Sequence, residues 1–192
     1  MRFLKPPKKS LGQNFLIDNN IINKIINIGN VKSNSIVLEI GPGYGNLTKM
    51  IINKKPKKIY AIEKDKKLSK LLKETCDKMN NIEIIHDDFL NIVNDKRLDK
   101  DMIVFGNLPY NISTKILASL ILLKEWPPWY QSLILMFQKE VADRITAKKG
   151  EKNYGRLSIL CNWRLNVKKH FNISKNCFTP KPKIDSTILS FM

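Results

Sequence analysis

The sequence has no long hydrophobic run and no pattern of paired cysteines. Its apolar segments are all shorter than the ~20 residues of a membrane-spanning helix, and the first nine residues lack the apolar centre of a signal peptide. The cysteines, Cys76, Cys161 and Cys177, have no C-x-x-C spacing and no nearby histidine, which excludes a recognisable zinc motif or disulfide framework. We therefore expect a cytoplasmic protein with neither a membrane segment nor a bound metal.

Acidic residues are scarce relative to basic ones. The chain has 17 Asp and Glu against 34 Lys and Arg, a formal net charge of +17. This balance favours a polyanionic partner, with nucleic acid as the first candidate. Lysine supplies 29 of the 34 basic residues, and Asn and Ile are also abundant. A compositional bias that produces a solvated, lysine-rich surface is therefore the alternative interpretation.

The first 140 residues alternate between buried-strand and helix patterns. A chain of 192 residues is long enough for one well-buried domain. Short, nearly continuous apolar runs predict strands at 36–40, 59–62, 82–85, 102–105 and 132–137. Helical spacing predicts helices at 47–54, 66–78 and 114–123. The alternation predicts an α/β fold with a doubly wound parallel sheet.

The pattern changes after Gly155. A helix is expected at 156–163, followed by two strands at 166–171 and 184–191 with no long helix between them. Two such strands predict an antiparallel hairpin at the edge of the sheet. The basic residues 1–9 form an expected disordered tail, and residues 10–192 form a single expected domain.

A glycine-rich turn follows the first predicted strand of the sheet. Gly41, Gly43 and Gly45 form a Gly-x-Gly-x-Gly pattern before the helix at 47–54. Glycines allow a tight turn and a close approach of the backbone to a ligand, although plain chain reversal also uses them. The third glycine comes one residue too early for the dinucleotide fingerprint, and no Gly-Lys-Ser/Thr phosphate loop is present.

Acidic residues follow the next two predicted strands. Glu63 closes the second strand, where a carboxylate can accept hydrogen bonds from both hydroxyls of a ribose. Asp87 and Asp88 follow the third strand and can accept from an adenine amino group. Singly, Glu63 could be a surface charge and Asp88 a helix cap. Together with the glycines they predict a nucleoside pocket without a phosphate loop, which is what S-adenosylmethionine requires.

The tetrapeptide Asn107-Leu108-Pro109-Tyr110 follows the strand at 102–105. Open α/β sheets place their chemistry at such strand ends. An Asn amide that accepts from an amine, a Pro that fixes the turn and a Tyr ring that stacks on a heterocycle suit a planar substrate amine. A simple strand-to-loop turn is the alternative.

Several blocks, in order along the chain, give a specific resemblance. Beside the glycine turn and the tetrapeptide, the matching blocks are KKSLGQNFL at 8–16, MFQKEVADR at 136–144, NYGRLS at 153–158 and FTPKPKIDS at 178–186. With them the chain resembles the class I methyltransferases, and more closely the ribosomal RNA adenine N6-dimethyltransferase family. The resemblance implies a Rossmann-like, mainly parallel seven-stranded sheet with helices on both faces.

The resemblance also assigns roles to residues. S-adenosyl-L-methionine is the implied cofactor, and the residues implied to bind it are Asn14, Leu16, Gly41, Gly43, Glu63, Asp88 and Asn107. The implied catalytic element is Asn107, Leu108, Pro109 and Tyr110. Tyr110 is the expected platform on which the substrate base stacks, with Phe178 as a second platform or as ordinary packing.

The implied substrate is small-subunit ribosomal RNA. Members of the family dimethylate two adjacent adenosines in a hairpin loop near its 3′ end, within the immature small subunit, and splayed loop bases suit such chemistry. We expect a monomer that contacts RNA phosphates through basic residues. The residues chosen for that role are Lys8, Lys9, Arg144, Lys148, Lys149, Lys181 and Lys183.

One departure and three alternatives accompany this interpretation. Family members usually continue past the last strand into a helical RNA-binding domain, which we expect to be absent here because the sequence ends at Met192. The alternative enzymes are a large-subunit rRNA adenine methyltransferase of the macrolide-resistance type and a DNA amino-methyltransferase, which usually has Pro in place of Leu108. A non-catalytic ribosome-assembly or transcription factor on the same fold is the third.

Overall fold

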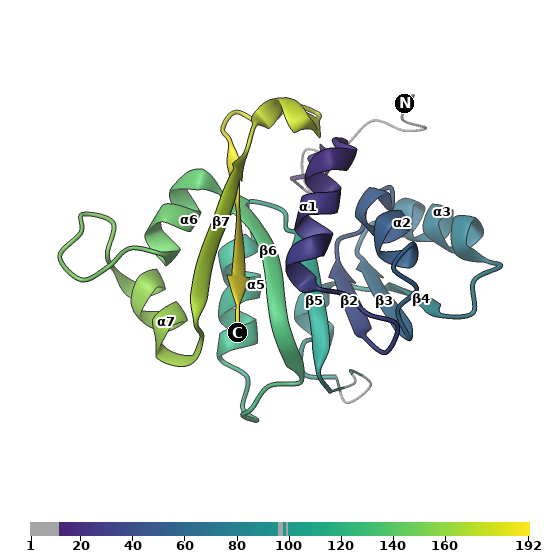
Figure 1. The fold of residues 1–192 in the computed structure, drawn as a ribbon, viewed down its shortest axis with the longest axis horizontal. Helices are drawn as coiled ribbons and strands as arrows, with labels where there is room; N and C mark the ends of the chain where they lie inside the picture. Colours follow the sequence, from purple (N-terminus) through teal and green to yellow (C-terminus); the bar gives the residue numbers. More distant parts are fainter. Residues whose placement is uncertain (1–11, 96–97, 99) are drawn as a thin grey trace.

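A seven-stranded mixed sheet forms the centre of the protein in a computed structural model, which describes residues 12–95, 98 and 100–192 (Figure 1). The strands, in sheet order, are β4 Ile82–His86, β3 Lys58–Glu63, β2 Ile36–Ile40, β5 Met102–Asn107, β6 Tyr130–Gln138, β9 Ser186–Phe191 and β7 Val167–Ile173. The five strands from β4 to β6 are parallel, and β9 runs antiparallel to both β6 and β7. The expected α/β class and the antiparallel edge strands are confirmed.

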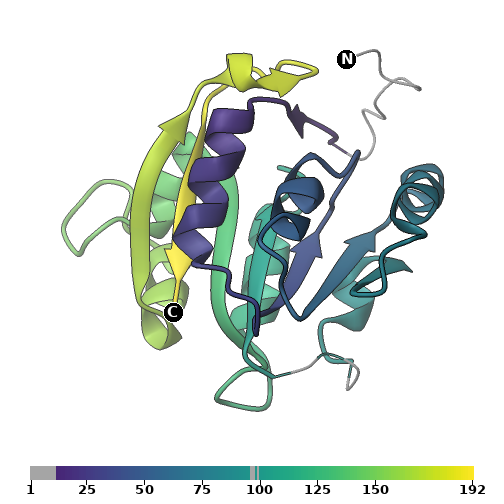
Figure 2. The same ribbon diagram turned by 45° about the vertical axis from the view of Figure 1, so that its right-hand side comes forward.

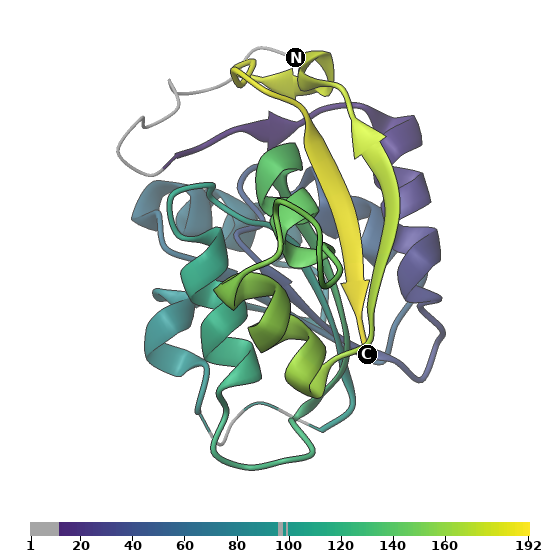
Figure 3. The same cartoon turned by 90° about the vertical axis from the view of Figure 1, so that its left-hand side faces the viewer.

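Helices cover both faces of the sheet (Figures 2 and 3). Alternate strand residues face opposite layers. On one face, Val37 and Ile59 pack in an apolar cluster with α1 Asn19–Gly29 and α2 Asn46–Ile52. Helix α3 Lys66–Cys76 packs on the sheet in a smaller cluster, where its Leu72 contacts Ala61 of β3. Leu38 and Tyr60 belong to the cluster on the other face, with helices α4 Phe89–Ile92, α5 Ser113–Ile121, α6 Lys139–Ile145 and α7 Arg156–Arg164. The arrangement is therefore doubly wound.

Helix α1 is an element that the sequence interpretation does not include. The Asp18 side chain accepts from the backbone N–H groups of Asn20 and Ile21 and caps the first turn. Ile22, Ile25 and Ile26 recur with helical spacing and are buried against the sheet. The short helices α4 and α6 were likewise not expected.

The hairpin connection carries a second, two-stranded sheet. Between β7 and β9 lie a short 3-10 helix, Lys175–Cys177, and β8 Phe178–Thr179. Strand β8 pairs antiparallel with β1 Phe15–Leu16, near the other end of the chain. The yellow connection at the top of Figure 2 thus lies against the segment that leads into α1. The basic tail expected at residues 1–9, with Lys8 and Lys9, lies outside the described residues.

The strand order reverses beside β2, whose neighbours are β3 and β5. In open α/β sheets ligands bind at such a switch point, outside the carboxyl ends of the strands. Strands β2, β3, β4 and β5 end at Ile40, Glu63, His86 and Asn107, along one edge. None of the helices in the described parts of the chain has the length and apolar character of a membrane-spanning segment.

Candidate functional site

A cavity opens at these four strand ends. Its lining includes all but one of the cofactor-binding and catalytic residues expected from the sequence: Asn14, Gly41, Gly43, Glu63, Asp88, Asn107, Leu108, Pro109 and Tyr110. These residues come from the segment before α1, the β2–α2 turn and the ends of β3, β4 and β5. The fold therefore brings into one site residues that are more than 90 positions apart in sequence.

The glycine turn forms one wall of the cavity. Gly41 has φ +69°, a backbone conformation that glycine adopts without strain, and a Cβ built there would meet no atom within 4 Å. The backbone at Gly41 thus faces open space. Gly43 has φ +60°, and a Cβ built there would lie 2.8 Å from the Phe15 ring. Glycine at 43 therefore allows the segment before α1 to close over the turn.

Glu63 joins the glycine turn to the end of β3. Its Oε2 accepts from the Gly43 backbone N–H at 3.0 Å, and its Oε1 accepts from the Asp65 N–H at 2.7 Å. Burial raises the pKa of the Glu63 carboxyl above its usual value, although these two backbone hydrogen bonds act in the opposite direction. Each carboxylate oxygen has a second lone pair. The carboxyl group is thus fixed in orientation and can still accept from a ligand.

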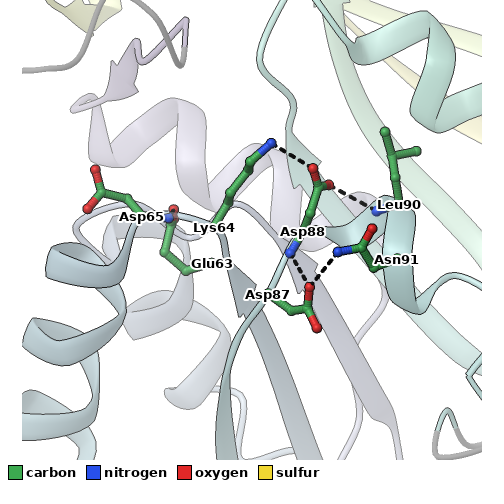
Figure 4. Close-up of polar contacts among 7 residues, drawn as sticks. All are labelled: Glu63, Lys64, Asp65, Asp87, Asp88, Leu90 and Asn91. Atoms are coloured by element: carbon green, nitrogen blue, oxygen red, sulfur yellow. Dashed lines mark hydrogen bonds and ion pairs between the residues drawn. The ribbon is translucent and has the colours of Figure 1, made fainter.

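A polar cluster closes the cavity beyond β4 (Figure 4). Asp88 accepts from the Leu90 N–H at 3.1 Å as the cap of α4, and it forms an ion pair with Lys64 at 2.7 Å. Burial alone would raise the pKa of Asp88, but the hydrogen bonds from Lys64 and Leu90 hold it below its ordinary value. Asp87 accepts from the Asn91 side chain at 2.9 Å. Asp88 is therefore an ionised acceptor at the cavity wall and also the helix cap.

Asn107 ends β5 at the centre of the site. Its Nδ2 donates to the backbone carbonyl of Asn14 at 2.8 Å, across 93 positions of sequence. This bond uses the donor end of the amide, so Oδ1 is the end that can accept a hydrogen bond. The side chain is half-buried and lines the cavity. The arrangement suits a ligand that donates an N–H.

Tyr110 stands on the loop between β5 and α5. Its hydroxyl forms a 2.6 Å hydrogen bond with the hydroxyl of Ser186, the first residue of β9. Burial raises the pKa of the Tyr110 phenol, against the smaller lowering by the Ser186 hydrogen bond. The phenol is therefore neutral at ordinary pH, and its half-buried ring adds an aromatic surface to the cavity.

Two expected site residues lie elsewhere. Leu16 is 6% exposed and Phe178 is 3% exposed, and both side chains belong to the apolar cluster beneath α1. Their backbones pair in the β1–β8 ladder, and neither residue lines the cavity described above. Phe178 thus has the ordinary packing that was its alternative interpretation.

The described basic residues chosen for RNA contact lie outside the cavity lining. Arg144 is exposed and forms an ion pair with Glu140 on α6. Lys148 and Lys149 are exposed in the connection between α6 and α7, and Lys181 and Lys183 are exposed between β8 and β9.

The cavity also has lining residues that sequence reasoning did not select. Gly12, Gln13, Lys64 and Asn111 are among them. A Cβ built on Gly12 would lie 3.0 Å from Oδ1 of Asn111, so these two segments approach closely. Gly12 and Gln13 fall inside the matching block at 8–16, and Lys64 and Asn111 directly follow Glu63 and Tyr110. Their position in the sequence, within or directly after the recognised motifs, was therefore the signal that could have identified them as lining residues.

Comparison with protein families and known proteins gives a consistent result. The family model for ribosomal RNA adenine dimethylase matches residues 5–191. The chain is 55% identical to ribosomal RNA small subunit methyltransferase A of Pelagibacter ubique (strain HTCC1062), over 96% of this chain and 69% of the relative. It is 48% identical to the protein of that name from Mycoplasmopsis synoviae (strain 53), over 97% of this chain and 70% of the relative.

Solved structures share the fold. A dimethyladenosine transferase from Plasmodium falciparum superposes with a TM-score of 0.81 at 34% identity, over 93% of this chain and 62% of that one. The 23S rRNA methyltransferase ErmE superposes with a TM-score of 0.78 at 26% identity, over 92% of this chain and 68% of that one. The chain thus spans about two thirds of the length of the proteins that it matches.

Proposed function

The chain belongs to the ribosomal RNA adenine dimethylase family, and from that premise we propose that it dimethylates the exocyclic amines of two adjacent adenosines in small-subunit rRNA, with S-adenosyl-L-methionine as methyl donor. The proposed substrate is the hairpin loop near the 3′ end of that RNA, in the immature subunit, and the proposed state is a cytoplasmic monomer. The observation that carries the proposal is the shared cavity of Glu63, Asp88 and the segment Asn107 to Tyr110.

The cavity fits S-adenosylmethionine at three points. The Gly41 backbone faces open space, Glu63 presents a fixed carboxyl that can accept from ribose hydroxyls, and Asp88 is an ionised acceptor for the adenine amine. Asn14 is held beside them through its carbonyl bond to Asn107. When bound, the cofactor supplies an electrophilic methyl group on a sulfonium centre. Gly43, Asn107 and Leu16 complete the proposed cofactor set; Gly43 and Asn107 line the cavity, and Leu16 directly follows the lining residue Phe15.

The protein's part in the methyl transfer is positioning. The amine of adenine is a poor nucleophile because its lone pair is delocalised into the ring. Hydrogen bonds to Oδ1 of Asn107 and to the backbone carbonyl of Leu108 favour a pyramidal nitrogen, whose lone pair then faces the methyl donor. Pro109 fixes the turn, and the Tyr110 ring stacks on the base. No strong base is required, because the methylated ammonium product loses its proton to water.

The Glu63 carboxyl gives a test of the cofactor site. We expect Glu63→Gln to weaken S-adenosylmethionine binding at least about tenfold, because an amide can accept through only one of its two ends. Isothermal titration with the cofactor measures the effect. Glu74→Gln, which changes an exposed carboxylate on α3, is the matched control. Unchanged cofactor affinity in Glu63→Gln would remove Glu63 from the proposed site.

Two exposed lysines test the proposed RNA surface. We expect Lys148→Gln with Lys149→Gln to weaken RNA binding and to reduce the slope of log affinity against log salt by about 1.4, since about 0.7 counterions are released per phosphate contact on a single strand. Binding to a small-subunit rRNA hairpin at several salt concentrations measures both. Lys73→Gln with Lys78→Gln removes the same charge at the opposite side of the sheet. An equal loss in both variants would show a general charge effect.

The substrate is tested by offering labelled cofactor with immature small subunits, large subunits and DNA in parallel. Nucleoside analysis should find N6,N6-dimethyladenosine in small-subunit rRNA only. Methylation of the large subunit would favour the alternative function, a large-subunit rRNA adenine methyltransferase like ErmE. The sequence identity favours the small subunit: it is 55% to the small-subunit enzyme of Pelagibacter ubique and 26% to ErmE. Cofactor binding without methylation of any substrate would favour a non-catalytic role.

A further inference from the structure

The hydroxyl of Ser186 is within 2.6 Å of the hydroxyl of Tyr110, and 76 positions of sequence separate the two residues. From this contact we propose that Ser186 is a positioning residue, which holds the Tyr110 ring in the orientation that receives the substrate base. The inference rests on the proposed function, in which Tyr110 is the stacking platform. Ser186 itself does not line the cavity, so it acts through the tyrosine.

Ser186 is a rigid anchor. It is fully buried, and as the first residue of β9 it pairs with Gln138 on β6 and with Ile173 on β7. The residue before it is also held, because the Lys139 N–H donates to the Asp185 carbonyl at 3.0 Å. A serine hydroxyl moves only by rotation about χ1. Its oxygen is therefore placed by the sheet.

Tyr110 needs such an anchor because it lies on a loop. Its backbone carbonyl accepts from the Ser113 hydroxyl at 3.3 Å, a contact that leaves the ring free to turn about its side-chain torsions. The hydroxyl bond fixes the far end of the ring to the sheet. A stacking platform that is already oriented loses less conformational entropy when a base binds. In the block at 178–186, the final serine thus anchors Tyr110 from outside the cavity, whereas Phe178 packs in the apolar core.

The test compares variants that remove either hydroxyl of the pair. We expect Ser186→Ala and Tyr110→Phe each to lower kcat/KM for RNA methylation about tenfold, while cofactor affinity stays unchanged. The double variant should lose about the same tenfold, because both changes delete one interaction. Ser186→Thr keeps the hydroxyl and should restore most of the activity. Ser190→Ala is the matched control: it removes a hydroxyl from the same strand, bonded to His170 at 2.8 Å.

Several outcomes would overturn the proposal. If Tyr110→Phe has the kcat/KM of the wild type, the proposal fails, even where Ser186→Ala folds poorly. The proposal also fails if the double variant loses about a hundredfold, because the two changes would then act independently. A loss in Ser190→Ala equal to that in Ser186→Ala would indicate general damage to β9. Tyr110→Ala tests the proposed function separately. If Tyr110→Ala methylates RNA normally, the stacking role of Tyr110 is wrong. If Tyr110→Ala is inactive and Tyr110→Phe is fully active, only the role of Ser186 is wrong.

Discussion

Asn107→Ala should reduce methyl transfer to the RNA by at least about a hundredfold and leave S-adenosylmethionine affinity within a few-fold of that of the wild type. The Asn107 amide is fixed by its 2.8 Å bond to the Asn14 carbonyl, which leaves Oδ1 as the acceptor for the adenine amine. Alanine removes that acceptor, and the amine keeps its planar, poorly nucleophilic form. Single-turnover methylation and cofactor titration separate the two effects.

Two further variants sharpen the Asn107 test. Asn107→Asp keeps an acceptor oxygen but replaces the donor to Asn14 with a second oxygen, so we expect an activity between those of the wild type and Asn107→Ala. Asn162→Ala removes an exposed amide on α7 and should behave like the wild type. Near-normal methylation of small subunits by Asn107→Ala would contradict the proposed role. A loss of cofactor binding equal to the loss of turnover would restrict Asn107 to its proposed part in the cofactor site.

The stability of the protein should depend on pH through Glu39. This residue is the next to last of β2, is 2% exposed, and accepts from the Thr48 hydroxyl at 2.6 Å. Burial raises the pKa of its carboxyl to about 8, against a smaller lowering by Thr48. The folded protein therefore holds this proton at pH values where the unfolded chain, with the ordinary pKa of 4.5, has released it.

The sign follows from that difference in proton binding. Because the pKa of Glu39 is higher in the folded protein, its contribution to the free energy of unfolding is fully present below pH 4.5, the pKa in the unfolded chain. This contribution is lost as the pH rises from about 4.5 to about 8, by up to about 5 kcal/mol. We expect Glu39→Gln, which is neutral at all pH values, to show no such loss from this position. The difference in the free energy of unfolding between variant and wild type should grow in favour of the variant across this range and then level off.

Urea unfolding at a series of pH values measures this difference. The comparison with Glu39→Gln isolates Glu39 from the other groups that titrate in the same range. Glu125→Gln is the control, since Glu125 is an exposed carboxylate away from β2. A constant difference between Glu39→Gln and wild type from pH 4.5 to 8 would show that Glu39 is ionised in the folded protein.

Much of the fold could be predicted because its signals are local. The apolar runs of β2, β3 and β5 identify buried strands; β2 has the predicted bounds, and β3 and β5 extend one or two residues beyond their runs. The helical spacing of Ile22, Ile25 and Ile26 after the capping residue Asp18 was also a readable signal for α1. Strands β1 and β8 have no comparable pattern. Each has two residues, and each exists only because the other lies beside it.

The candidate site also has features that local sequence patterns predict and features that depend on tertiary contacts. The sequence alone identified Glu63 and Asn107 as the last residues of parallel strands and Gly41 and Asp88 as residues just after two others, because strand periodicity and sheet direction place these carboxyl ends at one edge. The contacts that hold the site arise from tertiary packing: Asn107 donates to Asn14, Lys64 pairs with Asp88, and Ser186 bonds to Tyr110. Tertiary packing also places Phe178 in the core. These contacts join segments up to 93 positions apart, so they depend on how whole layers pack and not on any local pattern.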